Sequence, residues 1–299
     1  MLKTLLLIAA SILASAILFA ILITPAREFI TPGDASTVAL DAGEFEAYPL
    51  PEYVTEVLAE DYKSYLVEVE PAIKIHVLEV GTGYPVYLQH GNPTSGLLYR
   101  KVAAKLPTER MRVIMPTMVG LGFSSKIPVS EHKIENHLRW MNSVLEQLDL
   151  TELVYVGQDW GGPVGMGALA MSPGLLKGAV LMNTAFNAPT EKADLSRAHA
   201  AVKSPVIGEL LMEVFTTVFD QLHRAQGDPD SMNESVKSLY ARPVLESGNA
   251  KAPVALMRMV PDGPDHPSTP AMQVIEAYVG TLDIPAELIW GNSAPILGR

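Results

Sequence analysis

A short apolar run, Leu153–Val156, leads directly into the sequence Gly-Gln-Asp-Trp-Gly-Gly at residues 157–162. Apolar runs of this length, bounded by glycine, are typical of buried strands. The glycines that follow allow a sharp backbone turn, and residues 163–175 are small and apolar enough for a buried helix. The sequence therefore predicts a strand, a tight turn and a helix, with Asp159 at the turn.

This arrangement is typical of a nucleophile elbow, in which a reactive side chain lies between a strand and a helix. A helix N-cap would also explain an aspartate, but not the three glycines around it. The N-terminus of the following helix would favour an ionised Asp159. A carboxylate attacks saturated carbon and forms an alkyl ester, so the substrate must carry a leaving group. Hydrolysis of that ester needs a base, usually histidine, and an acid that orients it.

The rest of the chain alternates short apolar runs with helical segments, which predicts an α/β fold with a mostly parallel sheet. Strands are expected at residues 65–71 and 74–81, as an antiparallel pair, and at 84–91, 112–118, 153–160, 178–183 and 286–291. The last of these is expected near one edge of the sheet. Helices are expected at 96–106 and, with clear amphipathic spacing, at 134–150.

Five parts follow from this pattern, and each has a distinct composition. They are an N-terminal membrane anchor or signal segment (1–28), a linker and lead-in (29–62), the first part of the α/β core (63–184), a helical cap (185–270) and a last, incomplete part of the core (271–299). Ligands bind at the carboxyl ends of strands in open α/β sheets, so a cap inserted there would act as a lid.

Residues 5–24 are apolar except for Ser11, Ser15 and Thr24. About 20 such residues span a bilayer as a helix. A signal peptide is the alternative, but the small-residue sequence at 14–16 lies inside the apolar run rather than after it. An uncleaved transmembrane helix is favoured, with the domain outside the cytoplasm, periplasmic or extracellular. Cleavage would instead give a secreted protein.

The net charge is −11, and no basic block is present. Nucleic-acid binding needs clustered cations, so it is excluded as an expected function. The chain has no cysteine, which excludes disulfides and thiolate chemistry.

The loop His90-Gly-Asn-Pro-Thr-Ser95 follows the strand expected at 84–91. Together with Asp159-Trp160, it resembles the haloalkane dehalogenases of the α/β-hydrolase superfamily. Similar stretches also occur at 120–126, 240–244 and 255–268, and the resemblance covers about residues 62–299. It implies an α/β-hydrolase fold with a helical cap, and hydrolysis of a haloalkane to an alcohol and a halide. The partners implied are a small halogenated alkane and water, with no metal or organic cofactor.

The resemblance also implies roles for three residues. Asp159 matches the nucleophile that forms the alkyl-enzyme ester. The indole N–H of Trp160 and the side-chain N–H of Asn92 would bind the departing halide, and the backbone N–H groups of the same two residues would form the oxyanion hole. The structural alternatives are a core aromatic at 160 and a turn residue before proline at 92.

The resemblance fails at the acid and the base. The family's two acid positions are Asn183 and Ala294 here, and its base histidine would lie beyond Arg299. None of the seven histidines is expected to be the base. They are His76, His90 in the oxyanion loop, His132 and His137 at the start of a surface helix, and His199, His223 and His266 in the cap, with His266 at the surface. We therefore expect a truncated piece of a longer dehalogenase, or a degenerate relative, inactive or limited to a single turnover.

Two other functions stay open. An epoxide hydrolase shares the nucleophile, but it normally needs cap tyrosines, and Tyr240 and Tyr278 are the only tyrosines after residue 155. A non-catalytic, membrane-anchored, hydrolase-like binding protein would fit the missing acid and base.

Overall fold

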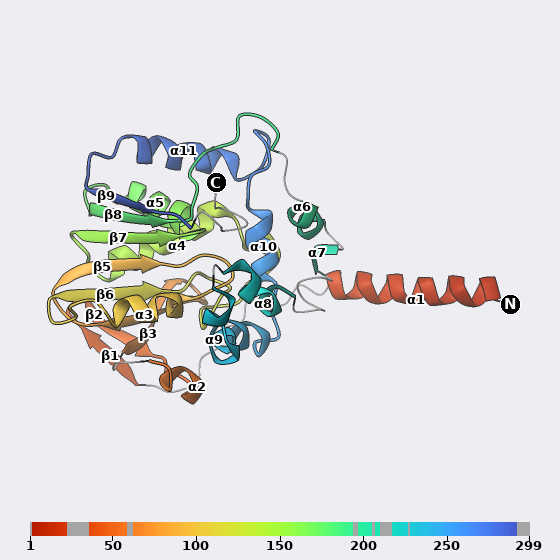
Figure 1. Ribbon diagram of the computed structural model, residues 1–299, viewed down its shortest axis with the longest axis horizontal. Helices are drawn as coiled ribbons and strands as arrows, with labels where there is room; N and C mark the ends of the chain where they lie inside the picture. Colours follow the sequence, from red (N-terminus) through yellow and green to blue (C-terminus); the bar gives the residue numbers. More distant parts are fainter. Residues whose placement is uncertain are drawn as a thin grey trace.

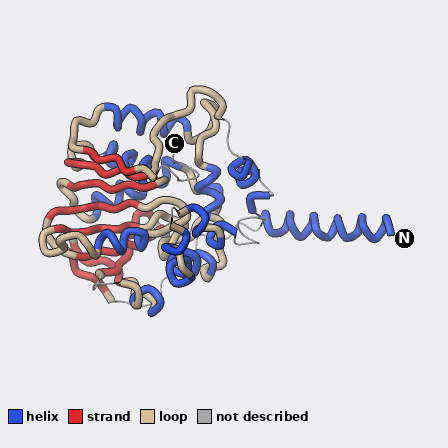
Figure 2. The backbone as a smooth tube through the Cα atoms, viewed as in Figure 1, coloured by secondary structure: helices blue, strands red, loops and turns tan. Residues whose placement is uncertain are grey.

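The computed structural model describes residues 2–22, 36–58, 62–193, 197–204, 207–209, 217–226 and 228–291. Nine strands form one sheet in the order β1-β2-β3-β4-β6-β5-β7-β8-β9. Helices pack against this sheet, and the cap helices lie beyond one end of its strands (Figure 1). Figure 2 shows the strands as one twisted layer.

The strands are β1 (Thr37–Leu40), β2 (Gly43–Ala47), β3 (Lys63–Glu70), β4 (Ile73–Val80), β5 (Tyr84–Gln89), β6 (Met111–Pro116), β7 (Leu153–Gln158), β8 (Leu176–Met182) and β9 (Ala286–Ile289). Neighbours from β1 to β4 and on to β6 are antiparallel, whereas β6, β5, β7, β8 and β9 are parallel to one another. The α/β fold is therefore confirmed, and the half of the sheet that carries Asp159 is the parallel half.

The core helices are η1 (Gly96–Tyr99), α3 (Arg100–Ala103), η2 (Val129–Glu131), α4 (Ile134–Gln147), α5 (Gly161–Met171) and α11 (Thr269–Gly280). The cap holds α6 (Arg197–Lys203), α7 (Ile207–Glu209), α8 (Thr217–Asp220), η4 (Leu222–Ala225), η5 (Pro229–Ser231), α9 (Glu234–Leu245) and α10 (Ala252–Arg258). Near the N-terminus lie α1 (Leu2–Leu22) and α2 (Glu52–Thr55). No strand occurs among the described residues of 187–270, which agrees with the predicted helical cap.

The position of the site follows from the direction in which the chain leaves two neighbouring strands. The chain leaves β5 toward β6 on one side, and it leaves β7 toward β8 on the other side. The carboxyl ends of β5 and β7 therefore border the point where strand order reverses, which is where open α/β sheets bind ligands. Asn92 follows β5 and Asp159 follows β7.

The predicted strands between residues 63 and 184 are present, and so is the predicted edge strand β9. All four residues of β9 are exposed, including Leu288 and Ile289. The helix expected at 96–106 is shorter, because η1 and α3 together end at Ala103.

The expectation of a linker at 29–62 needs correction, because strands β1 and β2 form a hairpin there that extends the sheet. Thr37 pairs with Glu46, and Ala47 pairs with Tyr65 of β3. Most residues of the hairpin are exposed or half-buried. Its strands therefore lack the strong apolar alternation on which a sequence-based prediction depends.

Helix α1 extends away from the rest of the molecule (Figure 1). Its exposed side chains include Leu6, Leu7, Ile8, Ile12 and Leu13. Within the described part of the chain, no helix reaches the length and apolarity that crossing a membrane requires. The predicted transmembrane helix is therefore not supported by the structure.

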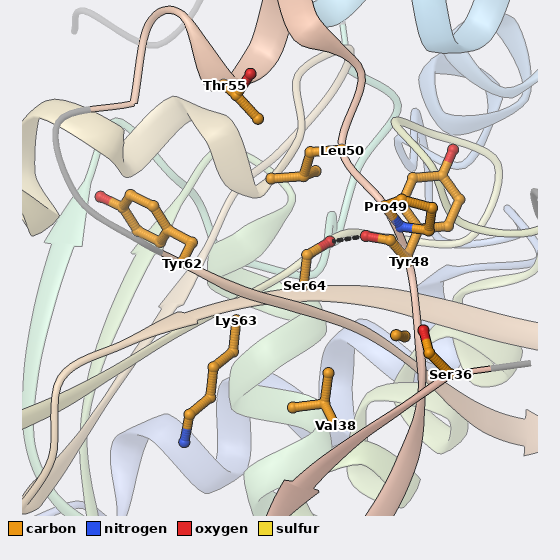
Figure 3. A pocket seen from close by; sticks show the side chains of 10 residues that line it. Ser36, Val38, Tyr48, Pro49, Leu50, Thr55, Tyr62, Lys63 and Ser64 are labelled. Atoms are coloured by element: carbon orange, nitrogen blue, oxygen red, sulfur yellow. Dashed lines mark hydrogen bonds between the residues drawn. The ribbon is translucent and has the colours of Figure 1, made fainter. Parts of the chain in front are cut away.

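A shallow cleft lies between the β1–β2 hairpin, α2 and the start of β3 (Figure 3). Val38 and Leu50 line it together with Ser36 and Lys63. The hydroxyl of Ser64 donates to the carbonyl oxygen of Tyr48 at 2.7 Å across this cleft. None of its lining residues belongs to the predicted site.

A buried charge network ties three strands together. Glu79 on β4 is 1% exposed. It accepts hydrogen bonds from Arg112 Nε on β6 at 3.0 Å, from Arg112 Nη2 at 2.9 Å and from the Tyr65 hydroxyl on β3 at 2.7 Å. Bidentate pairing of this kind offsets the cost of removing both charges from water.

Substitution of Arg112 by alanine should leave the Glu79 carboxylate buried without its main partner. We expect the free energy of unfolding to fall by about 3–5 kcal/mol, measured by urea denaturation. Arg110→Ala is the matched control, since Arg110 forms an exposed ion pair with Glu109 at 3.3 Å. Its loss should cost less than about 1 kcal/mol. Equal effects of the two substitutions would contradict this account of the network.

Candidate active site

Asp159 stands on the turn between β7 and α5, as the sequence predicts. Its φ of +53° lies in the left-handed region, which is unusual for a residue with a side chain. The turn is held from β8, because Asp159 N donates to Asn183 O at 3.1 Å and the Thr184 hydroxyl donates to Asp159 O at 2.7 Å. A side chain at Gly162 would collide with the Thr184 hydroxyl, so glycine is required there.

Two backbone N–H groups converge on the Asp159 carboxylate. Asn92 N donates to Asp159 Oδ1 at 2.8 Å, and the backbone N–H of Trp160 also bonds this carboxylate. The approach is close, since a Cβ at Gly91 would lie 2.5 Å from Asp159 Cβ. These are the two residues whose N–H groups were expected to form an oxyanion hole, and the fold brings them together.

The environment of Asp159 determines its charge. Burial raises the pKa of its carboxyl group to about 6, while the N–H groups of Trp160 and Asn92 act in the opposite direction. Burial dominates because an ionised carboxylate loses its hydration, and two donors only partly replace it. Above pH 6 the group is mostly ionised, which is the form that a nucleophile needs.

Trp160 lies at the N-cap of α5 and is 7% exposed. In the described part of the chain, its indole N–H has no protein acceptor. An indole N–H without a protein acceptor has its hydrogen-bonding capacity left for a ligand or for water.

The side chain of Asn92 has a contact that the sequence did not predict. Its Nδ2 donates to the carbonyl oxygen of Pro253 in α10 at 3.0 Å. One amide hydrogen therefore bonds the cap, and one hydrogen of the –NH2 group is left for an anion. A backbone carbonyl leaves no trace in a sequence, so this partner could not have been identified in advance.

Tyr99 was also missed. Its hydroxyl donates to Gln89 O at 2.8 Å, at the end of β5. Burial raises the pKa of the Tyr99 hydroxyl, and the negative charge of Asp159 raises it further. Tyr99 therefore remains neutral and acts as a structural hydrogen-bond donor beneath the oxyanion loop.

His90 holds the oxyanion loop and cannot serve as the base. Its Nε2 accepts from Met118 N at 2.9 Å, so its Nδ1 carries the proton and donates to Gly91 O at 2.7 Å. Burial lowers the pKa of His90 to about 4. Both ring nitrogens are used, which agrees with the structural role expected from the sequence.

The expectation that His132 and His137 lie on a surface helix is wrong. Both rings are buried, and His132 Nδ1 lies 3.1 Å from His137 Nε2. Burial lowers the pKa of each, for His132 to about 3. The polar residues around them suggested a solvated helix start, but η2 and α4 turn these two rings inward.

The remaining histidines are placed elsewhere. His76 is buried on β4 against the Ser64 hydroxyl, at 2.9 Å. His266 is half-buried rather than a surface residue, and its Nε2 lies 3.0 Å from Arg258 O. His223 lies in η4, and the side chain of His199 is outside the described residues, as is Ala294.

No described histidine side chain is hydrogen-bonded to Asp159. At the other expected acid position, Asn183 Oδ1 accepts from Gly291 N at 3.1 Å and so ties the ends of β8 and β9 together.

Comparisons with known proteins agree with this fold. The family of the α/β hydrolase fold matches residues 84–233. Haloalkane dehalogenase 2 of Mycobacterium bovis is 36% identical over 113 residues, which are 38% of this chain and 39% of that relative. The match thus spans about two fifths of the relative's length. Haloalkane dehalogenase 1 of the same organism is 30% identical over 220 residues, which are 72% of this chain and 69% of that protein.

A solved structure shares the fold. The crystal structure of a single-site mutant of the haloalkane dehalogenase DatA from Agrobacterium tumefaciens C58 superposes with a TM-score of 0.69. The two proteins are 25% identical, and the match covers 80% of this chain and 81% of the other.

The raised pKa of Asp159 predicts how stability depends on pH. A carboxyl group whose pKa is higher in the folded state stabilises the fold below its ordinary pKa, and this stabilisation is lost as the pH rises through about 6. Asp159→Asn should remove the dependence. The free energy of unfolding of the variant, relative to the unsubstituted protein, should therefore rise by about 2–3 kcal/mol between pH 4 and pH 7.

Denaturant unfolding at a series of pH values measures this difference. The amide that Asp159→Asn introduces can change the free energy of unfolding by a constant amount, but such a change does not depend on pH and so does not affect the comparison. A difference that stays flat from pH 4 to pH 7 would show that Asp159 is not a buried, ionising carboxyl group.

Proposed function

Because the chain belongs to the α/β-hydrolase family, and within it to the haloalkane dehalogenase-like members, we propose that its site displaces halide from an alkyl halide with the carboxylate of Asp159. The observation that carries the proposal is the convergence of two backbone N–H groups, of Asn92 and Trp160, on a buried carboxylate.

The proposed step is a displacement at saturated carbon. An oxygen of Asp159 forms a bond to carbon, the carbon–halogen bond breaks, and the halide leaves with the bonding electrons. The products are an alkyl ester of Asp159 and a halide ion, so atoms and charge balance. The indole N–H of Trp160 and the free amide hydrogen of Asn92 would stabilise the negative charge that grows on the halogen.

The second half-reaction would need an activated water molecule. Water attacks the ester carbonyl, and the N–H groups of Asn92 and Trp160 would then stabilise the oxyanion. A base must take the proton of that water. His90 has both ring nitrogens engaged, and His132 and His137 bond each other. We therefore propose that this chain alkylates Asp159 and hydrolyses the ester slowly.

The proposal predicts a covalent adduct after incubation with a short bromoalkane. Intact mass should increase by one alkyl group less one hydrogen, and Asp159→Asn should abolish the increase. Asp149→Asn is the matched control, since Asp149 also has a positive φ, of +50°, but is exposed. That control should form the adduct normally. Adduct formation should become faster as the pH rises through about 6, because only the carboxylate attacks.

Four outcomes would contradict this proposal. An unmodified mass in a folded sample would exclude the displacement step, and quenching of Trp160 by bromide without an adduct would favour the non-catalytic binding protein. Bromide release over many turnovers would show that a base is present. Adduct formation with a short epoxide but not with the bromoalkane would favour the epoxide hydrolase, although the hydroxyl of Tyr240, a tyrosine of the cap, already accepts from Arg100 Nη1 at 3.1 Å.

We also propose, from the amino-acid sequence, that residues 5–24 attach the protein to a membrane with the hydrolase domain outside the cytoplasm. The test compares the full chain with a variant that lacks residues 2–28. After extraction of cell membranes at high pH, the full chain should stay in the pellet and the shortened chain should not. Release of both would contradict membrane attachment.

A further inference from the structure

Asn92 has two functions at once because its backbone and its side chain bond different parts of the molecule. Its backbone N–H lies on the Asp159 carboxylate, whereas its side-chain Nδ2 bonds Pro253 O in the first turn of α10. A carbonyl oxygen only accepts hydrogen bonds, so Pro253 determines which end of the amide faces the cap.

The other end of the amide shows that this orientation is imposed. Asn92 Oδ1 is buried and has no hydrogen-bond partner among the described residues. A buried acceptor without a partner is unfavourable, and an amide that was free to rotate would relieve it. The contact with α10 therefore holds the side chain in a position that it would not otherwise keep.

The first turn of α10 is itself seated on the core. Ala252 is 2% exposed and packs over Gly120, whose φ is +93°. A Cβ at Gly120 would lie 2.5 Å from Ala252 Cβ and 2.6 Å from His132 Cε1, so only glycine allows α10 to approach this closely. The buried ring of His132 also lies against Gly120 at this contact.

Cap contacts hold the far side of α10. Val254 packs with Val202 of α6 in a separate buried cluster, and Arg258 Nη2 donates to Ser204 O at 3.2 Å. Helix α10 therefore joins the cap to the core at the point where Asn92 is held.

We infer that the first turn of α10, seated on Gly120, positions the amide of Asn92 for the departing halide. Gly120, Ala252 and Pro253 are then positioning residues, and this inference rests on the halide role proposed for Asn92. While Pro253 O takes one amide hydrogen, the other hydrogen is left for the anion and the negative Oδ1 is turned away. A shift of α10 frees the amide to rotate, so the position of the cap controls halide affinity.

The test compares two glycine-to-alanine substitutions at positions with similar positive φ, so the backbone strain that each introduces is similar. They differ in the atoms that the added methyl group meets. Gly120→Ala places a methyl group against Ala252 and His132, whereas Gly174, with a similar φ of +99°, has nothing within 4 Å of its Cβ position. Bromide affinity is measured from the quenching of tryptophan fluorescence. The contribution of Trp160 is the part of this quenching that the Trp160→Phe variant lacks. Gly120→Ala should weaken it about tenfold, the effect of losing one hydrogen bond to a charged group. Gly174→Ala should not change it.

A double-mutant cycle separates positioning from general destabilisation. In an Asn92→Ala background, Gly120→Ala should cause no further loss of bromide affinity. The pH midpoint of Asp159 alkylation should stay near 6 in Gly120→Ala, because the backbone N–H of Asn92 remains on the carboxylate. An equal loss in both backgrounds, or equal effects of Gly120→Ala and Gly174→Ala, would overturn the inference.

If Gly120→Ala fails to fold, Ala252→Gly tests the same seat by removing the methyl group that packs on Gly120. Its bromide affinity should fall in the same direction by a smaller factor, and unchanged affinity would overturn the inference. Failure of the proposed function is distinguishable, since the unsubstituted protein would then form no Asp159 adduct, whether or not bromide quenches its tryptophan fluorescence.

Discussion

The burial of one carboxylate is the constraint on which the site depends. Removing Asp159 from water raises its pKa to about 6, and the backbone N–H groups of Asn92 and Trp160 partly replace the lost hydration. Both donors must point at the same carboxylate. That requirement fixes the left-handed φ of Asp159, the close approach of Gly91, and the adjacency of the loops after β5 and β7.

The sequence predicted the parts of this arrangement that are local. A strand followed by glycines 157, 161 and 162 defines the turn at Asp159. The apolar run that forms the strand and the glycines that allow the tight turn are adjacent in the sequence. The loop after β5 was predicted from its place directly after a strand and from its resemblance to the haloalkane dehalogenase loop. The pairing of these two loops follows from a parallel sheet, in which adjacent strands end at the same edge.

The parts that the sequence could not predict depend on contacts distant along the chain. His132 and His137 were expected at the surface, since their polar neighbours resemble a solvated helix start, but the fold buries both rings. Asn92 was expected to offer its side chain to a halide, and its bond to Pro253 O, 161 residues away, involves a backbone atom that any residue carries. The β1–β2 hairpin was missed because half-exposed strands lack a strong apolar alternation.

Displacement and hydrolysis place different demands on one site. The proposed displacement needs an ionised carboxylate and donors for the halide, and the proposed donors are two side chains, of Trp160 and Asn92, on neighbouring loops. Hydrolysis needs a mobile proton acceptor beside the ester, yet the buried ring of His90 is held by hydrogen bonds to the backbone and those of His132 and His137 by each other. The same dense packing that brings Asp159 and its donors together therefore immobilises these imidazoles. In the proposed mechanism, the displacement step therefore uses groups already in place, whereas ester hydrolysis depends on a proton acceptor other than these three imidazoles.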